Sequence, residues 1–195
     1  MTVVWLRPGT AGGFECVNCL RDAMFEKELQ QAGVSVISVP LYLPLEQYPG
    51  LPVFYPAIRM AIAAYVPWFR KVRLFDSPVL LRRVARLNFS HDPEAGARLT
   101  EYMLSGKNCE EEDARLAGSL QADPDCVLTS TTLLIHQGAA LAEHFACPLF
   151  SLTGGEDQWI DFLSNAQTVR NLIAGHAGWT PISADADGIN RLRKI

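Results

Sequence analysis

The sequence predicts a single Rossmann-like α/β domain with a mostly parallel sheet and helices on both faces. A chain of 195 residues, 49% of them hydrophobic, has the length and the apolar content for one well-buried core. Short apolar runs alternate with longer helical segments near both ends of the chain, which is the order of a parallel α/β sheet. The short runs are almost continuously apolar, as expected for strands that are buried on both faces.

The first forty residues predict a βαβ unit. Residues 2–6 form a β-branched and apolar strand that a glycine loop, residues 9–13, brings to an end. Residues 14–31 then have the pattern of an amphipathic helix that stops at Gly33, and residues 34–39 form a second strand. The crossover between two such parallel strands is expected to be right-handed.

The middle of the chain predicts a proline-rich loop followed by a helical insertion, together covering residues 40–120. Five prolines within residues 40–56 remove backbone donors and break both helices and sheet ladders. Two or three helices are expected to follow. Ser77-Pro78 and Asp92-Pro93 mark helix starts, because serine and aspartate cap helices and proline suits the first helical turn.

The alternation of strand and helix resumes after residue 125. The predicted elements are a strand at 126–129, a helix at 132–145, a strand at 148–152, a turn at Gly154-Gly155, a helix at 157–174, a strand at 179–182 and a helix from 184 to the terminus. With the first two strands, these segments complete one parallel sheet. The whole chain, residues 1–195, is therefore predicted to be one domain.

Composition excludes some classes of function. The net charge of −4 provides no basic field to gather a polyanion, so nucleic acid is not an expected partner. The apolar start is interrupted at Arg7-Pro8, too early for a signal peptide or a membrane span, and a cytoplasmic location is expected. Five scattered cysteines do not resemble a disulfide framework, so reduced thiols are expected.

Two glycine loops are the candidate ligand sites, because ligands of open parallel sheets lie beyond the carboxyl ends of the strands. Gly12 and Gly13 precede a helix whose amino terminus suits a phosphate, and Gly154 and Gly155 follow a later strand. The alternative is a pair of tight turns that bind nothing. Neither loop matches the Gly-x-Gly-x-x-Gly dinucleotide fingerprint, which disfavours a nicotinamide enzyme.

Several segments, in this order, resemble the amino-terminal domain of bacterial family-4 glycosyltransferases of the GT-B fold. A subgroup of that family shares the Cys-x-x-Cys-Leu-Arg-Asp run found here at residues 16–22. Residues 76–82, residues 130–134 and the strand that leads into Gly-Glu-Asp at residues 155–157 also occur in the order that the family places them. The resemblance covers nearly the whole chain.

The resemblance implies the acceptor-side half of a retaining glycosyltransferase. It implies a nucleotide sugar as donor, bound mainly by a carboxyl-terminal domain that a separate polypeptide or a missing portion of the chain supplies, and no cofactor. The expected partners are that donor domain, a second copy of this chain, and a saccharide or lipid-linked acceptor. Gly154 stands where relatives have His or Gln, so the alternative is a binding or assembly subunit without transferase activity.

Glu156 and Asp157 are the candidate catalytic residues. They follow a strand and a glycine turn, where carboxylates can bind acceptor hydroxyls or act as a base. The alternative is an acidic pair that caps the start of a helix.

Cys16 and Cys19 suggest a third class, a redox or metal protein, because a helix start lowers thiol pKa values. Cys109, Cys126 and Cys147 supply no second ligand pair, so a structural role for the two thiols and no metal site are predicted. His136 and His144 are eight residues apart, too far for a metal pair on one helical turn, and are expected to be ordinary core or surface residues.

Residues 54–87 are basic and aromatic in an otherwise acidic chain. They hold seven cations against the single acid Asp76, interleaved with aromatic residues. The cations are Arg59, Arg70, Lys71, Arg73, Arg82, Arg83 and Arg86. Such a stretch predicts either contact with an anionic membrane or a lipid-linked acceptor, or aromatic core residues beside a solvated basic face.

Overall fold

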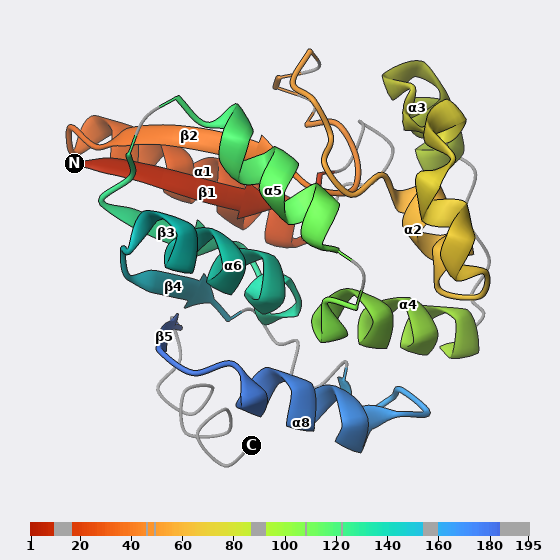
Figure 1. Ribbon diagram of the computed structural model, residues 1–195. Helices are drawn as coiled ribbons and strands as arrows, with labels where there is room; N and C mark the ends of the chain where they lie inside the picture. The colour runs from red at the N-terminus through yellow and green to blue at the C-terminus, as the bar shows by residue number, and fades with distance from the viewer. Residues whose placement is uncertain are drawn as a thin grey trace.

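A five-stranded, all-parallel sheet forms the centre of the computed structural model (Figure 1). The structure describes residues 1–9, 17–45, 47–48, 50–86, 93–107, 109–121, 123–153 and 160–183. The strands are β1 (Thr2–Arg7), β2 (Ser35–Pro40), β3 (Cys126–Thr129), β4 (Leu149–Leu152) and β5 (Trp179–Ile182). Their order in the sheet is β2-β1-β3-β4-β5, so the predicted fold class, a single Rossmann-like α/β domain, is confirmed.

The described helices follow the predicted order with one difference in the insertion. They are α1 (Val17–Gln31), α2 (Ala57–Ala63), η1 (Pro67–Lys71), η2 (Arg73–Asp76), α3 (Pro78–Arg86), α4 (Pro93–Ser105), α5 (Glu110–Ser119), η3 (Thr132–Leu134), α6 (Ile135–Phe145) and α8 (Ala166–Gly175). The insertion thus holds more helices than the two or three expected, because its short turns at η1 and η2 separate α2 from α3. Helices begin at Pro78 and Pro93, as predicted.

Two hydrophobic clusters cover the two faces of the sheet. Alternate residues of β1 divide between them, as the two-residue period of a strand requires. Val4 and Leu6 join the larger cluster, which α4, α5, α6 and α8 cover, whereas Val3 and Trp5 face α1. The Trp5 ring meets the edge of the Phe25 ring at 5.7 Å. In Figure 1, α1 lies behind the sheet and α6 in front of it.

The helix α1 is not the simple amphipathic helix that its sequence predicts. Its buried positions include Asp22 and Glu26, while Leu20 and Met24 are exposed. Apolar and charged residues are therefore exchanged between the two faces, and the helix has almost no hydrophobic asymmetry. The helix stays on the sheet because its buried carboxylates meet a buried cation, described below.

The prediction of one continuous helix over residues 157–174 is wrong in the middle of that range. Residues 161–165 form turns, and α8 begins at Ala166. The Asn165 side chain donates to the Ala97 carbonyl at 3.0 Å and to Glu101 at 2.8 Å. Such side-chain bonds hold the residue at the helix start instead of its interior. Residues 154–159 and 184–195 lie outside the described residues.

The helix α6 lies unusually close to the sheet at Gly138. A Cβ atom at this position would come within 2.6 Å of the Thr129 methyl carbon and 2.9 Å of a Leu149 methyl carbon. Thr129 in turn donates to the Ser151 hydroxyl at 2.8 Å, which links β3 to β4 beneath the helix. A glycine in the middle of α6 therefore sets the distance between helix and sheet.

Candidate functional site

The carboxyl ends of β1 and β3 define the candidate site. In the strand order β2-β1-β3, the chain passes from β1 to its neighbour β2 on one side, and the next strand along the chain, β3, pairs with β1 on the opposite side. In open parallel sheets ligands bind at such a point, where the connections diverge. The arrowheads of these strands lie at the same edge in Figure 1. Ser130 continues the pairing past β3, because its N–H donates to the Leu6 carbonyl at 3.0 Å.

A buried ionic cluster stands at this edge, which we call the edge cluster: Arg7, Asp22 and Glu26. Arg7 ends β1, and its Nη1 donates to Glu26 at 2.9 Å while its Nε lies 3.9 Å from Asp22. All three side chains are less than 10% exposed. Charges so far from water persist only when paired. Glu26 also accepts from the Ser38 hydroxyl at 2.9 Å, which ties β2 to the cluster.

Arg21 connects the edge cluster to the surface. Its guanidinium donates to Asp22 at 2.8 and 3.1 Å and to the Ser130 carbonyl. The side chain is 29% exposed, yet its Nη1 is buried without a partner among the described residues. Burial raises the pKa of the Asp22 carboxyl, and the Arg21 and Arg7 guanidiniums limit that rise. Arg21 therefore presents a donor at the point where β1 and β3 diverge.

The turn after β3 adds hydroxyl groups next to this donor. Thr131 accepts from the Leu133 N–H at 3.3 Å and so caps η3. The Thr132 hydroxyl is fully buried and has no partner within the described part of the chain. The Thr131 hydroxyl is thus used in the cap and the Thr132 hydroxyl is buried, so the partly exposed Arg21 guanidinium is the group of this edge that suits a polar or anionic ligand.

The predicted loop and catalytic residues fall in two segments of the sequence, next to β1 and β4, that the structure does not describe. Gly12, Gly13, Gly154, Gly155, Glu156 and Asp157 all lie outside the described residues. Their roles as ligand-binding and catalytic residues remain predictions. The edge cluster was not predicted from the sequence, because Arg7 looks like an ordinary charge before a loop and Glu26 like an ordinary charge on a helix. The one signal that could have revealed it is a pair of acids four residues apart on the helix face that also carries Phe25.

Three cysteines of the described part, Cys109, Cys126 and Cys147, are poor nucleophiles. Cys16 lies outside that part, and Cys19 is half-buried in α1. Cys109, Cys126 and Cys147 are free thiols. Burial raises the pKa of Cys109 to about 12 and raises those of the other two, which keeps them protonated at neutral pH. No group of three or more metal-ligating side chains occurs among the described residues; the role of Cys16 and Cys19 stays a prediction.

The basic stretch is not the uniform solvated face that its composition suggests. Arg59 is fully buried and forms what we call the insertion cluster with Asp76 and Glu112, at 2.8 and 2.6 Å. The acidic first turn of α5 also meets Arg73 through Glu111 and Arg70 through Glu110. Several of the cations are therefore partly neutralised, because α5 folds back onto them.

The same stretch nevertheless exposes large apolar side chains. Tyr65, Val66, Trp68, Leu74 and Val79 are 37–78% exposed. Lys71 and Arg83 are exposed beside them. The aromatic residues are therefore divided: Phe54 and Tyr55 belong to the core, as one interpretation predicts, whereas Trp68 does not.

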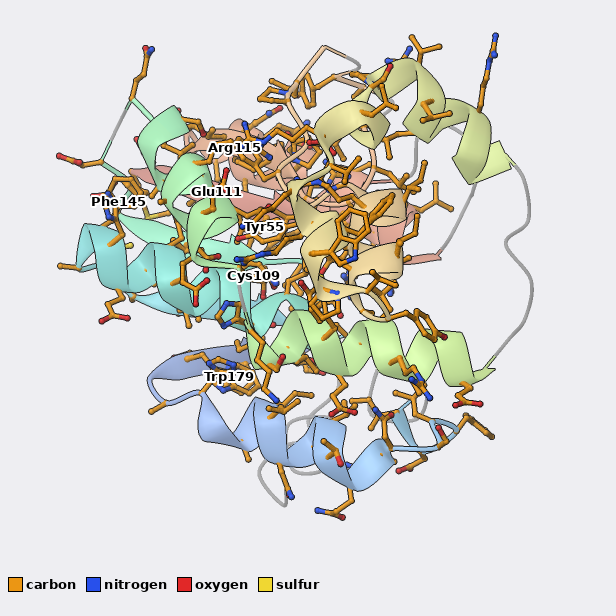
Figure 2. All side chains as sticks on the ribbon, turned by 45° about the vertical axis from the view of Figure 1, so that its right-hand side comes forward. Tyr55, Cys109, Glu111, Arg115, Phe145 and Trp179 are labelled. Carbon is orange, nitrogen blue, oxygen red and sulfur yellow. The ribbon has the colours of Figure 1, made fainter. Side chains whose placement is uncertain are left out.

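A chain of hydrogen-bonding side chains beside α5 was also missed from the sequence. The Tyr55 hydroxyl donates to Asp113, and the His136 ring lies 3.5 Å from the same carboxylate. Figure 2 shows Tyr55 and Cys109 together where the proline-rich loop meets α5. The His136 and His176 rings are 5.6 Å apart, and burial lowers the pKa of His176. Residues from four distant segments meet here, which no local pattern can predict.

Comparisons with known proteins add no relative to this picture. No protein-family model, curated protein sequence or solved structure matches the chain. The fold therefore defines the class, a Rossmann-like α/β protein, and the resemblance to GT-B glycosyltransferases stays an inference from the quoted residues. Within the described residues, no helix is long and apolar enough to cross a membrane.

Proposed function

We propose that this chain is the acceptor-side domain of a retaining GT-B glycosyltransferase and acts with a donor-binding domain. One observation carries the proposal. Arg21 and Asp22 belong to one segment that resembles the family and Ser130 to another, 109 residues away from Arg21, and the Arg21 guanidinium bonds the Ser130 carbonyl. Segments chosen for their sequence alone thus meet at the edge where a ligand is expected.

The chemistry of this edge fits a role in binding more than in bond breaking. Arg21 can orient hydroxyl or phosphate groups of an acceptor against a donor held by the second domain. A base would come from Glu156 or Asp157, the acids that the sequence predicts. A nucleotide sugar would be bound mainly by the donor domain, so the chain alone should not transfer sugar.

The test combines this chain with a second polypeptide that carries a GT-B donor-binding domain, beginning with the one encoded beside it. We expect the mixture to transfer labelled sugar from a nucleotide donor to acceptors in a cell extract, and the chain alone to transfer none. Arg21→Gln should lower kcat at least tenfold without changing the affinity between the two polypeptides. Glu143→Gln, on an exposed part of α6, is the matched control.

Three outcomes contradict the proposal. Transfer by the isolated chain would show that no donor domain is needed. Full activity of Arg21→Gln in the mixture would separate the edge cluster from catalysis. A tight complex that never transfers sugar would favour the alternative, a non-catalytic assembly subunit, for which Gly154 is the sequence observation.

We also propose that residues 65–83 make reversible contact with an anionic membrane. The exposed Trp68 and Leu74 carry this proposal, since isolated apolar residues are common on surfaces but a cluster of them beside cations is not. Each cation near the surface contributes about 1 kcal/mol of attraction. The acids of α5 reduce the sum, so we expect weak, salt-sensitive binding.

Vesicle co-sedimentation tests this contact. The chain should bind vesicles that contain anionic lipid and not neutral ones, and binding should fall as added salt shortens the Debye length from about 10 to about 3 Å. Trp68→Ser/Leu74→Ser should abolish it, whereas Phe162→Ser, which changes an equally exposed residue of another segment, should not. Binding that the double variant leaves intact would rule this surface out.

A further inference from the structure

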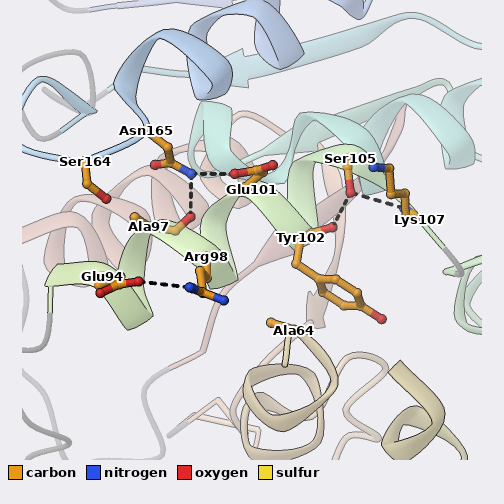
Figure 3. Close-up of a pocket in the computed structure, with 10 residues that line it drawn as sticks. All are labelled: Ala64, Glu94, Ala97, Arg98, Glu101, Tyr102, Ser105, Lys107, Ser164 and Asn165. Carbon is orange, nitrogen blue, oxygen red and sulfur yellow. Dashed lines mark hydrogen bonds and ion pairs between the residues drawn. The ribbon is translucent and has the colours of Figure 1, made fainter. Parts of the chain in front are cut away.

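A pocket on α4 gathers polar groups at a second place. It lies between α2, α4 and the turn before α8, and its volume is about 470 Å³ (Figure 3). This volume falls within the range of small-ligand sites. Figure 1 shows α2 and α4 beyond the arrowheads of the strands, so the pocket and the edge cluster lie toward the same end of the sheet. We call it the α4 pocket.

The lining of the α4 pocket is polar and balanced in charge. Glu94 and Glu101 provide two carboxylates, and Arg98 and Lys107 provide two cations. Most of the residues that line it are polar, although apolar atoms such as those of Ala64 and Ala97 also contribute to its surface. The two carboxylates are matched by two cations, so the lining has no net charge and favours neither an anion nor a cation. The ligand that matches this wall is uncharged and carries both donors and acceptors, as a hydroxyl does.

The polar groups are held in place before any ligand arrives. Asn165 donates to Glu101 at 2.8 Å, which fixes the turn before α8 against α4. Arg98 donates to Glu94 at 2.9 Å, and its guanidinium lies 5.1 Å from the centre of the Tyr65 ring. An ionised carboxylate accepts about four hydrogen bonds, so each acid keeps capacity for a ligand. Preorganised groups of this kind lower the entropic cost of binding.

The pocket also has features that suit a ring with apolar faces. Tyr102 lines it, and an aromatic ring offers an apolar surface. The Asn165 Oδ1 is buried without a donor partner among the described residues.

We propose that the α4 pocket binds an uncharged polyhydroxylated group, such as a sugar ring. Glu94 and Glu101 accept from its hydroxyls, while Arg98 and Lys107 donate to them. That this sugar is part of the acceptor rests on the proposed function; the pocket's preference for a neutral polyol rests only on its own side chains. The α4 pocket would thus hold a sugar ring of the acceptor, and the edge cluster would position the acceptor hydroxyl that reacts.

Two-dimensional amide NMR of the whole chain, with methyl β-glucoside and inorganic phosphate as probes, tests the pocket. We expect the glucoside to shift amides of residues 94–107 and 163–166 with a Kd in the millimolar range, and phosphate to leave them unchanged. Ser164→Trp places a large ring on the exposed rim and should weaken glucoside binding at least tenfold. Gln167→Trp, equally exposed on α8 but outside the lining, should bind as the native chain does.

Glu101→Gln sharpens the charge argument. It removes one carboxylate and keeps an oxygen that can accept from Asn165, so the fold should persist while the glucoside binds more weakly and phosphate gains affinity. Three results would each overturn the proposal. The glucoside could cause no shifts, it could cause the same shifts in Ser164→Trp as in the native chain, or phosphate could bind the native chain at these amides. A pocket that binds glucoside in a chain that supports no transfer would overturn the proposed function alone.

Discussion

Arg7 and Arg59 occupy similar settings in two regions of the molecule. Each is a buried arginine, 4% and 1% exposed, and each lies between two carboxylates. The insertion cluster stays inside the fold: Arg59 also donates to the Arg70 carbonyl at 2.6 Å, and its Nη2 is buried without a partner among the described residues. The edge cluster continues through Arg21 to the surface and to the end of β3. The same residue types, an arginine between two carboxylates, thus support the fold in the insertion cluster and form a polar site that reaches the surface in the edge cluster.

The largest expected effect comes from Arg59→Met. Asp76 and Glu112 would both lose the guanidinium between them, and breaking a buried pair in this way costs roughly 3–5 kcal/mol of unfolding free energy. Urea denaturation followed by circular dichroism measures it. Arg98→Met, which removes an exposed pair four residues apart on α4, is the control and should cost about 0.3–0.5 kcal/mol. A loss at Arg59 no larger than the control would show that the insertion cluster does not support the fold.

A second substitution asks whether the charges themselves are needed. Arg59→Met/Glu112→Met replaces the buried pair with apolar side chains, which is often neutral in stability. We expect it to recover more than half of the loss in the same urea experiment. No recovery would mean that the hydrogen bonds to Asp76 and to the Arg70 carbonyl matter more than the pair.

Arg7→Met should destabilise less than Arg59→Met. Asp22 keeps the Arg21 guanidinium, and Glu26 keeps the Ser38 hydroxyl. With these partners in place we expect a loss of about 2–3 kcal/mol, near the cost of one unsatisfied charged group. The same denaturation series measures it. A loss greater than that of Arg59→Met would reverse the comparison, because the edge cluster would then be the stronger support.

Arg21→Gln should have a smaller effect on stability than Arg7→Met. Its side chain is partly exposed, but its partner Asp22 is buried and would keep only the Arg7 guanidinium, 3.9 Å away, so we expect a loss of about 1–2 kcal/mol. The expected result is a small decrease in the urea midpoint together with the loss of transfer described above. A destabilisation as large as that of Arg7→Met would assign Arg21 to the fold and not to binding.

The contributions of His176 and Asp22 to the pH dependence of stability should differ in sign. The folded chain lowers the pKa of His176, so its contribution is present above pH 6.5 and is lost as the pH falls through 6.5 toward the folded pKa. Asp22 has a raised pKa, so its contribution is present below pH 3.8 and is lost as the pH rises through the folded pKa. His176→Asn should flatten the unfolding free energy near pH 6, and Asp22→Asn should leave that range unchanged. An unchanged slope in His176→Asn would contradict this assignment.

The fold was predictable because its signals are local. Strand β3 and strand β5 have the predicted bounds, and β1 extends the prediction by one residue, to Arg7. Apolar runs of strand length depend on neighbouring residues only, and so do the proline starts of α3 and α4. The break at Asn165 was not predictable, because it depends on bonds to α4, more than sixty residues earlier in the chain.

The candidate site was predictable only as a location. The rule for parallel sheets indicated the carboxyl ends of the strands, and the edge cluster lies there. Its residues were missed because burial, not residue type, distinguishes Arg7, like Arg59, from the more exposed arginines. The α4 pocket needs residues from α2, α4 and the turn before α8 together, so no spacing in the sequence indicates it.

The contact of Gly138 with Thr129 and Leu149 has an evolutionary consequence. A Cβ atom at position 138 would press on the methyl groups of both Thr129 and Leu149, so replacing this glycine requires both partners to shift or be shortened. Thr129→Ser would remove the contacting methyl and keep the hydroxyl that donates to Ser151, whereas Thr129→Ala would also remove that bond. Substitutions at these positions should therefore be accepted in a fixed order or together, and homologues should vary at positions 129, 138 and 149 as a set.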